Sequence, residues 1–280
     1  MSYFDFDALH SEDKKMHEIK QLALQLAPTQ ASILVQGEAG TGKTSLARYV
    51  HTKSRAARLY VVECKTTQFL DLSKISSGTL IVEDIDCASA ALQADLLSLF
   101  ARTDGERPRM ISTSRRDLRA MVKQEQFRQD LFYKIAVINL EMPRLESRTL
   151  DFTGIVNFVL EVSQIIHGKS GLVISAEAYE RLRAWNWPGN IRELENVIER
   201  AVVLARTSML GSECIQFEAL TNEDLGDFVP GMSLSEVEKR LILQTLELTA
   251  QNRTRAAQML GISIRTLRNK LNEYKEESLV

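Results

Sequence analysis

The segment SILVQGEAGTGKTSLARYVH, residues 32–51, decides the fold class of this chain. It consists of a short apolar β-type run, a loop of the pattern G-x-x-x-x-G-K-[ST] and a stretch with helical periodicity. Glycines let such a loop close tightly around phosphate with its backbone N–H groups directed inward, and the following helix adds its positive N-terminus. The segment therefore predicts a phosphate-binding loop in an α/β domain.

The loop residues 37–44 form the candidate cofactor site. The Lys43 ammonium is expected to reach the β and γ phosphates of ATP, and the Thr44 hydroxyl is expected to bind Mg²⁺. The remaining loop residues would surround the phosphates; they are Gly37, Glu38, Ala39, Gly40, Thr41 and Gly42. The alternative is a glycine-rich turn with a surface lysine, which the strand and helix on either side disfavour.

Short β-rich runs alternate with helical patterns up to about residue 145. The runs cover residues 32–37, 59–64, 79–84, 109–114 and 136–141. Such alternation predicts a mostly parallel sheet with helices on both faces. We therefore assign residues 1–145 to an α/β nucleotide-binding subdomain.

The rest of the chain divides into three parts. Residues 146–214 lack strand runs and show helical periodicity, which predicts a helical lid subdomain. Residues 215–232 are acidic and end in a Pro-Gly pair, which is typical of a linker. Residues 233–280 begin with Ser and Glu three positions apart, a capping-box pattern, and continue as helices.

Composition excludes several classes of protein. The chain has 280 residues, of which 44% are hydrophobic and 26% charged, as in an ordinary soluble protein. The first fifteen residues lack an uncharged apolar core, and no apolar run approaches the roughly 20 residues of a membrane span. The cysteines, Cys64, Cys87 and Cys214, fit neither a disulfide framework nor a zinc site. We expect free thiols, no membrane association and a cytoplasmic location.

Charge is distributed unevenly along the chain. The net charge is −2, yet the segment from Asn252 to Lys275 carries six Lys or Arg and one Glu. A basic end on a neutral or acidic body predicts a module that binds nucleic acid. The alternative is a solvated helix face that happens to be basic.

The string GTLIVEDID, residues 78–86, runs from an apolar strand into a group of acids. A phosphate loop needs a second anchor for magnesium and a group that orients water, usually acids at the end of a neighbouring strand. Glu83 and Asp84 are therefore the candidate catalytic pair, with Glu83 also a candidate Mg²⁺ ligand beside Thr44. The alternative is that these acids only mark where a strand meets the surface.

From residue 30 to residue 204 the chain resembles the AAA+ domain of bacterial enhancer-binding proteins, which drive transcription by remodelling RNA polymerase that holds sigma-54. The strings that carry the resemblance are GEAGTGKT with LARYVH, SGTLIVEDID, FRQDLFYKI (127–135) and WNWPGNIRELENVIERAVVLA (185–205). The string NRTRAAQMLGISIRTLRNKL (252–271) resembles the Fis-type helix-turn-helix that ends such proteins. The resemblance implies an α/β AAA+ P-loop domain with a parallel sheet and a small helical lid, followed by an all-α Fis-type helix-turn-helix domain. No receiver domain is expected ahead of the ATPase.

The resemblance also implies roles for two arginines. Arg128 matches the arginine finger, which reaches the nucleotide of a neighbouring subunit in AAA+ rings. Arg192, two residues after the Gly189-Asn190 turn, would sense the γ phosphate from the lid. For each arginine the alternative is a surface salt bridge.

The chain departs from the family pattern at four places. Family members have Asp then Glu where this chain has Glu83 then Asp84, and a displacement near 1 Å costs about a hundredfold in rate. Thirteen residues separate Cys64 from Gly78, too few for the family's GAFTGA loop, and no GAFTGA string occurs. The stretch before residue 109 is also short. Finally, Arg115 stands where the family has Asn.

We therefore expect a DNA-binding regulator that binds ATP, is at most a weak ATPase, and does not contact sigma-54 through the usual loop. It would act as a repressor, with another sigma factor, or as a subunit mixed with a complete family member. The alternative is an ATP-hydrolysing sigma-54-dependent activator. RNA polymerase is a candidate partner in either case.

The C-terminal string shows no such departures. Residues 253–260 are expected to form the first helix of the motif, with Gly261 in the turn and Leu267, Leu271 and Tyr274 packed inward on the recognition helix. The candidate DNA-binding residues are Arg253, Arg255, Ser263, Arg265, Thr266, Arg268, Asn269 and Lys270. The upstream helix, with Val237, Leu241, Ile242 and Leu248, is expected to dimerise this domain on double-stranded DNA. Together with an AAA+ ring, this predicts a homo-oligomer or a hetero-oligomer.

Overall fold

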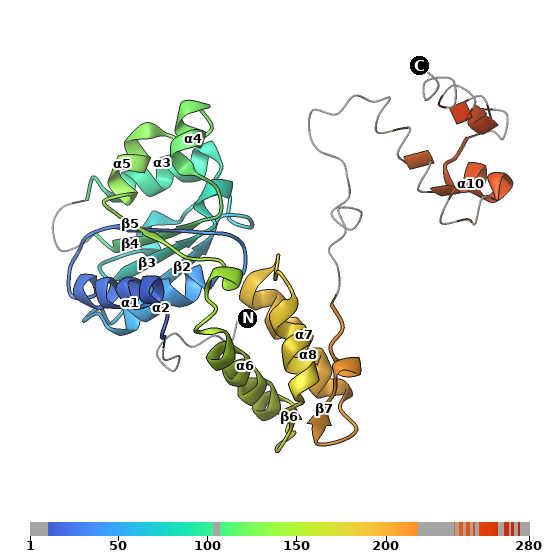
Figure 1. The fold of residues 1–280 in the computed structure, drawn as a ribbon. Helices are drawn as coiled ribbons and strands as arrows, with labels where there is room; N and C mark the ends of the chain where they lie inside the picture. Colours follow the sequence, from blue (N-terminus) through green and yellow to red (C-terminus); the bar gives the residue numbers. More distant parts are fainter. Residues whose placement is uncertain are drawn as a thin grey trace. The chain divides into compact units, whose positions relative to one another are not determined.

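The computed structural model describes residues 11–102 and 107–217 and a subset of the C-terminal residues. That subset consists of residues 238, 241–242, 245–246, 249, 252–262, 266–268, 270–271 and 274. The chain divides into two compact units, Met1–Phe217 and Glu218–Val280, each with its own hydrophobic core (Figure 1). Within the described residues, every helix is too short or too polar to span a lipid bilayer.

A five-stranded parallel sheet forms the centre of the first unit in the part of the chain that the structure describes. The strands lie in the order β2-β3-β4-β1-β5. Their bounds are Ile33–Gln36 (β1), Leu59–Glu63 (β2), Thr79–Glu83 (β3), Arg109–Ser114 (β4) and Ile138–Glu141 (β5). All the β-rich runs of the sequence form strands, so the expected parallel sheet is confirmed.

The two faces of the sheet bury different side chains, because successive strand residues point to opposite faces. Ile33 and Val35 of β1 belong to the core covered by α1 (Lys14–Leu26) and α2 (Lys43–Thr52). Leu34, between them, belongs to the core under the other three helices of this subdomain. These are α3 (Ala90–Leu99), α4 (Leu118–Lys123) and α5 (Gln129–Ile135). Packing against the sheet holds the start of α2 at the C-terminal end of β1.

Helix α1 lies ahead of the sheet, where the sequence analysis assigns no helix. The Asp13 carboxylate caps it by accepting a hydrogen bond from the Met16 N–H at 3.0 Å. Its buried residues follow helical spacing and are Met16, Ile19, Ala23 and Leu26. The helix is therefore held by one apolar face on the same core as α2.

The lid contains three helices in the described residues, α6 (Phe152–Ile166), α7 (Ala176–Ala184) and α8 (Asn190–Leu204). The expectation of a lid without strands is wrong in one detail, because β6 (Val173–Ile174) and β7 (Met209–Leu210) form a parallel pair. Two-residue strands are too short to show an alternating pattern in a sequence. Short 3-10 turns lie at Leu72–Lys74, Ile85–Cys87, Leu145–Ser147 and Ser212–Cys214.

The lid continues past residue 214, where the sequence analysis ends it. Ile215 is 1% exposed, and Phe217 stacks on Trp185 with the ring centroids 4.5 Å apart. The segment expected as a linker from residue 215 thus begins with residues that pack on the lid. The acidic composition of the segment gave no sign of this packing, because only Ile215 and Phe217 make the contact. Residues 218–232 lie outside the described residues.

A buried ion pair connects the N-terminal segment to the start of the lid. Arg148 Nη2 and Nε donate to Asp151 Oδ2 at 2.9 and 3.2 Å, and both side chains are fully buried. The other carboxylate oxygen of Asp151 accepts the backbone N–H groups of Glu12 and Asp13 at 2.8 and 3.0 Å. Burial alone would raise the pKa of Asp151, but these hydrogen bonds and the Arg148 charge outweigh it and lower the pKa.

Replacing Asp151 by Asn should lower the free energy of unfolding by about 3–5 kcal/mol, because it leaves the Arg148 charge buried without a counter-charge. Since the pKa of Asp151 is lowered, this contribution is present above the pKa of an unfolded aspartate, about 4, and is lost as the pH falls below it. Urea unfolding at pH 7 and pH 3 measures both effects. Asp71→Asn is the matched control, since Asp71 pairs with Lys74 at the surface and should matter little. Equal losses for the two variants would contradict the prediction.

The described residues of the second unit form a small helical core. Helix α10 (Arg253–Met259) is followed by Gly261 with a φ of +67°, the left-handed turn expected at this position. Leu267 and Tyr274 are buried, and Leu271 packs against the same core. The inward face expected for the recognition helix is therefore confirmed. The other buried members of the core are Ile242, Leu246, Ala256 and Ala257.

Candidate functional site

The phosphate loop connects β1 to α2 in a conformation that requires glycine. Gly37, Gly40 and Gly42 have φ angles of 150°, 77° and 94°, values that other residues rarely adopt. A Cβ on Gly40 would also lie 2.1 Å from the carbonyl oxygen of Gly189 in the lid. Glycine at position 40 thus allows the loop and the lid to approach each other closely.

The Lys43 side chain is folded back onto the loop. It is 7% exposed, and its Nζ donates to the Glu38 carbonyl oxygen at 2.6 Å. The Thr41 hydroxyl donates to the same oxygen at 2.9 Å. Burial lowers the pKa of Lys43 to about 8, an effect that Asp84 opposes and Arg115 reinforces. Among the described residues no carboxylate forms an ion pair with this ammonium, and its hydrogen bond is to a carbonyl oxygen.

A pocket of about 300 Å³ brings the phosphate loop, the sheet and the lid together. Lys43, Thr44, Glu83, Asp84 and Arg192 all line it, although they are far apart in the sequence. The rest of the lining consists of Ala39, Gly40, Gly42, Ser45, Glu63, Lys65, Thr113, Arg115 and Ile191. Three of the expected loop residues are not part of the lining, namely Gly37, Glu38 and Thr41.

Asp84 lies between two cations. Lys65 Nζ is 2.9 Å from one carboxylate oxygen of Asp84, and Arg115 Nε is 3.4 Å from the other. Burial would raise the pKa of Asp84, but the hydrogen bond from Lys65 and the charge of Arg115 outweigh it and lower the pKa. The Asp84 backbone N–H also donates to Thr113 Oγ1 at 3.0 Å. A cation therefore lies against each oxygen of this carboxylate and makes the group less basic.

Lys65 is the cation beside Asp84 that was not identified from the sequence. It follows the end of β2, and Glu63 of β2 lies directly opposite Glu83 of β3. A lysine after one parallel strand, beside the acids at the end of another, is the signal that could have identified it. The pairing of β2 with β3 is needed to recognise that signal.

Glu83 and Thr44 have the right atoms for a magnesium ion. Glu83 carries a carboxylate 3.8 Å from the Arg48 guanidinium, and burial raises its pKa, with Arg48 opposing and Glu63 reinforcing the effect. No group of three or more His, Cys, Asp or Glu that could hold a metal occurs among the described residues. Mg²⁺ typically binds one or two carboxylates and completes its shell with phosphate and water oxygens. A hydroxyl and a carboxylate in one pocket fit that requirement.

Asn190 joins the lid to the phosphate loop. Its side-chain amide donates to the Ala39 carbonyl at 3.0 Å, and its side-chain oxygen accepts the Leu145 N–H at 2.9 Å. The residue is 1% exposed and has a φ of 55°, in the left-handed region that Asn tolerates. The Glu38 carboxylate also faces the lid side, where it pairs with Arg144. This explains why the Glu38 side chain does not line the pocket.

Arg128 lies outside the pocket of its own chain. Its guanidinium is half exposed and donates to the two Asp130 oxygens at 2.8 and 3.0 Å. Its backbone N–H donates to Gln93 Oε1 at 2.9 Å, which fixes the start of α5. A contact with the nucleotide site would have to involve a second copy of the chain.

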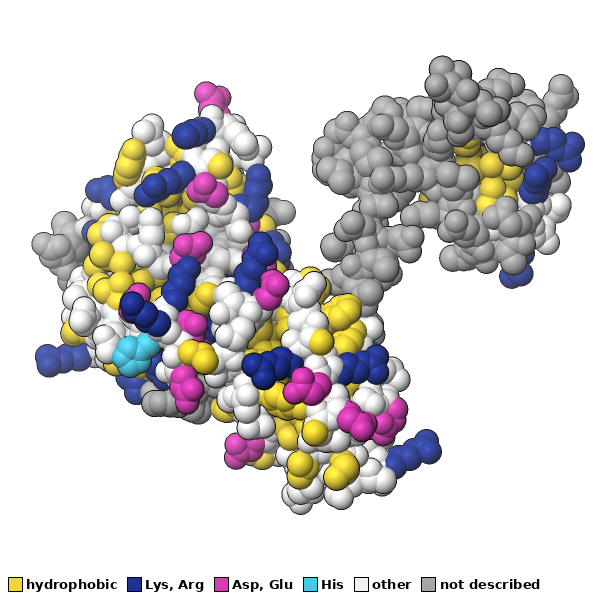
Figure 2. Space-filling view, in the orientation of Figure 1, with side chains coloured by type: hydrophobic (Ala, Val, Ile, Leu, Met, Phe, Trp, Pro, Cys, Tyr) yellow, Lys and Arg dark blue, Asp and Glu magenta, His cyan; other side chains and the backbone are white. Residues whose placement is uncertain are grey.

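The candidate DNA-binding residues are only partly described. Arg253, Arg255, Thr266 and Arg268 are exposed, and Figure 2 shows Lys and Arg side chains on the surface of the second unit. Lys270 Nζ pairs with Glu238 at 2.8 Å. The remaining candidates lie outside the described residues, namely Ser263, Arg265 and Asn269.

The sequence matches known families over nearly its whole length. The matches are a sigma-54 interaction domain at residues 11–145, an AAA+ ATPase lid domain at 146–226, and the Fis family of bacterial regulatory proteins at 233–274. The transcriptional regulatory protein FlbD of Caulobacter vibrioides is 36% identical, over 94% of this chain and 70% of FlbD. The chain belongs to the bacterial enhancer-binding proteins.

Other relatives agree with this family. The regulatory protein AtoC of Escherichia coli K12 is 35% identical, over 92% of this chain and 66% of AtoC. Crystalline NtrX from Brucella abortus, in complex with ADP, is similar in structure with a TM-score of 0.68 and 22% identity, covering 95% of this chain and 68% of NtrX. RuvB of Thermotoga maritima gives a TM-score of 0.56 at 15% identity, covering 94% of this chain and 86% of RuvB. At these identities the solved structures show that this enhancer-binding protein has the AAA+ fold.

Proposed function

We propose that this enhancer-binding protein is a sequence-specific DNA-binding transcription regulator whose AAA+ domain binds ATP and hydrolyses it slowly. The observation that carries the proposal is the environment of Asp84. In ATPases with a phosphate loop, an acid at this place orients the attacking water. Asp84 is one methylene shorter than the family's Glu, and Lys65 and Arg115 each pair with one of its oxygens, which makes the carboxylate a weaker base. Such an acid is poorly placed to orient water, so ATP binding should survive better than turnover.

The residues of the 300 Å³ pocket have distinct roles in this proposal. The backbone of residues 37–44 surrounds the phosphates, with Lys43 on the β and γ phosphates. Thr44 and Glu83 hold Mg²⁺, which neutralises charge on the phosphate oxygens. Arg192 reaches the γ phosphate from α8, and Arg128 acts on the nucleotide of a neighbouring subunit.

The connection between β2 and β3 supports a changed relation to sigma-54. It consists of Cys64–Gly78 and contains only the 3-10 turn Leu72–Lys74, all within the described residues. No GAFTGA string occurs in this connection or elsewhere in the chain. Contact with sigma-54 through the family's usual loop is therefore not part of the proposal. The proposal includes three modes of action: repression, regulation with another sigma factor, or a hetero-oligomer with a complete family member.

The second unit supplies the contact with double-stranded DNA in this proposal. Exposed Arg253, Arg255 and Arg268 suit phosphates and guanine edges. Leu241 is 44% exposed next to the buried Ile242, so the upstream helix offers an apolar contact for dimerisation. In this proposal the protein is cytoplasmic and binds DNA as an oligomer. RNA polymerase is its candidate partner.

The proposal is tested by measuring ATP binding and steady-state turnover on the same purified protein, with and without DNA and over a range of concentrations. We expect saturable ATP binding with a kcat below about 1 per second, the low end of typical enzymes. Lys43→Ala should abolish ATP binding, whereas Lys123→Ala, the same change at an exposed site, should not. Robust turnover that rises with protein concentration would contradict the proposal and support an ATP-hydrolysing sigma-54-dependent activator.

A further inference from the structure

A hollow of about 1150 Å³ lies at the edge of the sheet opposite the phosphate loop. Its walls come from the segments that lead into the strands, including residues 27–30, 54–58, 72–73 and 75–79. Strand β3 begins at this hollow with Thr79 and ends at the nucleotide pocket with Glu83. At about 3.3 Å per residue, the two sites are separated by the length of the strand.

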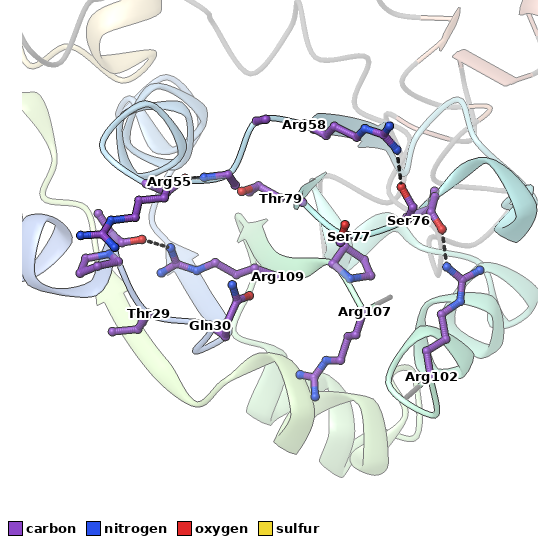
Figure 3. A pocket seen from close by; sticks show the side chains of 18 of the residues that line it. Thr29, Gln30, Arg55, Arg58, Ser76, Ser77, Thr79, Arg102, Arg107 and Arg109 are labelled. Atoms are coloured by element: carbon purple, nitrogen blue, oxygen red, sulfur yellow. Dashed lines mark hydrogen bonds between the residues drawn. The ribbon is translucent and has the colours of Figure 1, made fainter. Parts of the chain in front are cut away.

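Arginines dominate this hollow, which we call the arginine hollow (Figure 3). The arginines in its lining are Arg55, Arg58, Arg102, Arg107 and Arg109. Among the described residues, the lining contains no Asp or Glu and none of these arginines is ion-paired with an acid. Several like charges around one concave surface repel each other unless an anion is present.

Arg109 forms part of the wall. It is 3% exposed, and its three guanidinium nitrogens donate to the carbonyls of Leu26, Ala27 and Ala31 at 2.9, 3.0 and 3.1 Å. These bonds fix the end of α1 and the start of β1. Arg109 therefore contributes positive charge to the hollow while each of its three nitrogens already donates to a carbonyl of the wall.

Arg102 and Arg58 shape the opposite wall. Arg102 donates to the carbonyls of Leu72 and Ile75, and so holds the turn between β2 and β3 in place. Arg58 Nη1 donates to Ser76 Oγ at 2.8 Å, which leaves the rest of its guanidinium for another partner. These hydrogen bonds from Arg58 and Arg102 hold the connection between β2 and β3, including Ser76, in a fixed position on this wall.

Three arginines lie at the opening without an acidic partner among the described residues. Arg55, Arg58 and Arg107 are exposed, and Arg107 is positioned by the Phe100 ring, with 4.4 Å between its guanidinium carbon and the ring centroid. In Figure 3, Arg58 and Arg107 lie on opposite sides of the hollow. Guanidinium groups on different sides can hold more than one anionic group of a single ligand.

A buried hydroxyl gives a second, independent indication of a ligand. Thr79 lines the hollow and is 0% exposed, yet its Oγ1 has no hydrogen-bond partner among the described residues. A buried polar atom without a partner is costly and is usually satisfied by water or a ligand. Thr79 lies in the wall of the hollow, so a small shift of the wall would bring this hydroxyl to a ligand there.

We propose that the arginine hollow binds a small molecule that carries two or more phosphate groups. The planar guanidinium fork matches phosphate oxygens, and the neighbouring Ser76 and Ser77 add hydroxyl donors. The volume is slightly above the roughly 300–1,000 Å³ of typical small-molecule sites. A concave surface suits a compact ligand better than a DNA duplex, which needs a protruding or extended basic surface.

The test uses the whole protein with its phosphate loop saturated by a nonhydrolysable ATP analogue. Titration calorimetry with pyrophosphate should then show one further site with a dissociation constant below about 1 mM, and inorganic phosphate should bind more weakly. The double variant Arg58→Gln/Arg107→Gln should weaken pyrophosphate binding by about tenfold or more. Arg183→Gln/Arg206→Gln, which makes the same charge change on the lid, should leave it unchanged.

A second arm separates this site from the phosphate loop. Lys43→Ala, measured without the analogue, should keep pyrophosphate binding at the hollow even if the proposed ATP binding proves wrong. Absence of pyrophosphate binding up to about 10 mM would overturn the inference. So would equal weakening in the lid variant, loss of binding in Lys43→Ala, or tighter Arg58-dependent binding of a random duplex or a glutamate-rich peptide. Thermal unfolding of each variant reports whether it is folded, and ATP binding does so for the variants that keep Lys43.

Discussion

Replacing Glu83 by Asp, Asp84 by Glu and Arg115 by Asn in one chain should raise the steady-state kcat for ATP by about a hundredfold. The first two changes restore the family's acid order, which places the longer side chain on the water. The third removes the cation 3.4 Å from the carboxylate at position 84, which becomes more basic and accepts a hydrogen bond from water more strongly. ATP affinity should change much less, because the phosphate loop and Lys43 are untouched.

Two partial variants separate the causes of this change. Glu83→Asp/Asp84→Glu tests the acid order alone, and Arg115→Asn tests the cation alone. Arg116→Asn is the matched control, because Arg116 is the adjacent exposed arginine and binds Gln126 instead of the acids. Unchanged turnover in the triple variant would show that neither the acid order nor the cation limits hydrolysis. The two segments expected to be shorter than in the family, between Cys64 and Gly78 and before residue 109, would then be the remaining differences to examine.

Replacing Arg265 and Arg268 by Ala should weaken site-specific DNA binding by about a hundredfold or more. Each arginine that contacts a guanine edge contributes about 1–3 kcal/mol of discrimination, and the two should add if they read different base pairs. Arg268 is exposed on the helix whose other face buries Leu267 and Tyr274. Arg265 lies outside the described residues, so its part in the prediction rests on the sequence.

The measurement uses a duplex selected by the unaltered protein from a random-sequence pool, followed by titration at fixed salt. Salt must be fixed because phosphate contacts make affinity fall steeply with ionic strength. Arg183→Ala on the lid is the control for loss of charge. Retained binding to the selected duplex would refute the assignment of the recognition helix, whereas a uniform loss on all duplexes would indicate phosphate contacts only.

The phosphate loop and the five strands could be predicted from the sequence because each depends on a local pattern. The spacing of glycines at positions 37, 40 and 42 and the apolar runs are visible within a few residues. The lid strands and helix α1 were not predicted. A two-residue strand carries no periodicity, and α1 is stabilised by packing on a core built from the rest of the domain.

Both acids of the nucleotide site, Glu83 and Asp84, were also identifiable in the linear chain, since a strand ending in acids beside a phosphate loop is a local signal. The ion pairs that lower the pKa of Asp84 were not identifiable in this way. Its cations, Lys65 and Arg115, come from segments after β2 and β4, and they meet only because parallel strands align their C-terminal ends at one edge. The arginine hollow depends on folding in the same way, at the opposite edge of the sheet. Its charges are spread from residue 55 to residue 109 and form one surface only when the starts of the strands are side by side.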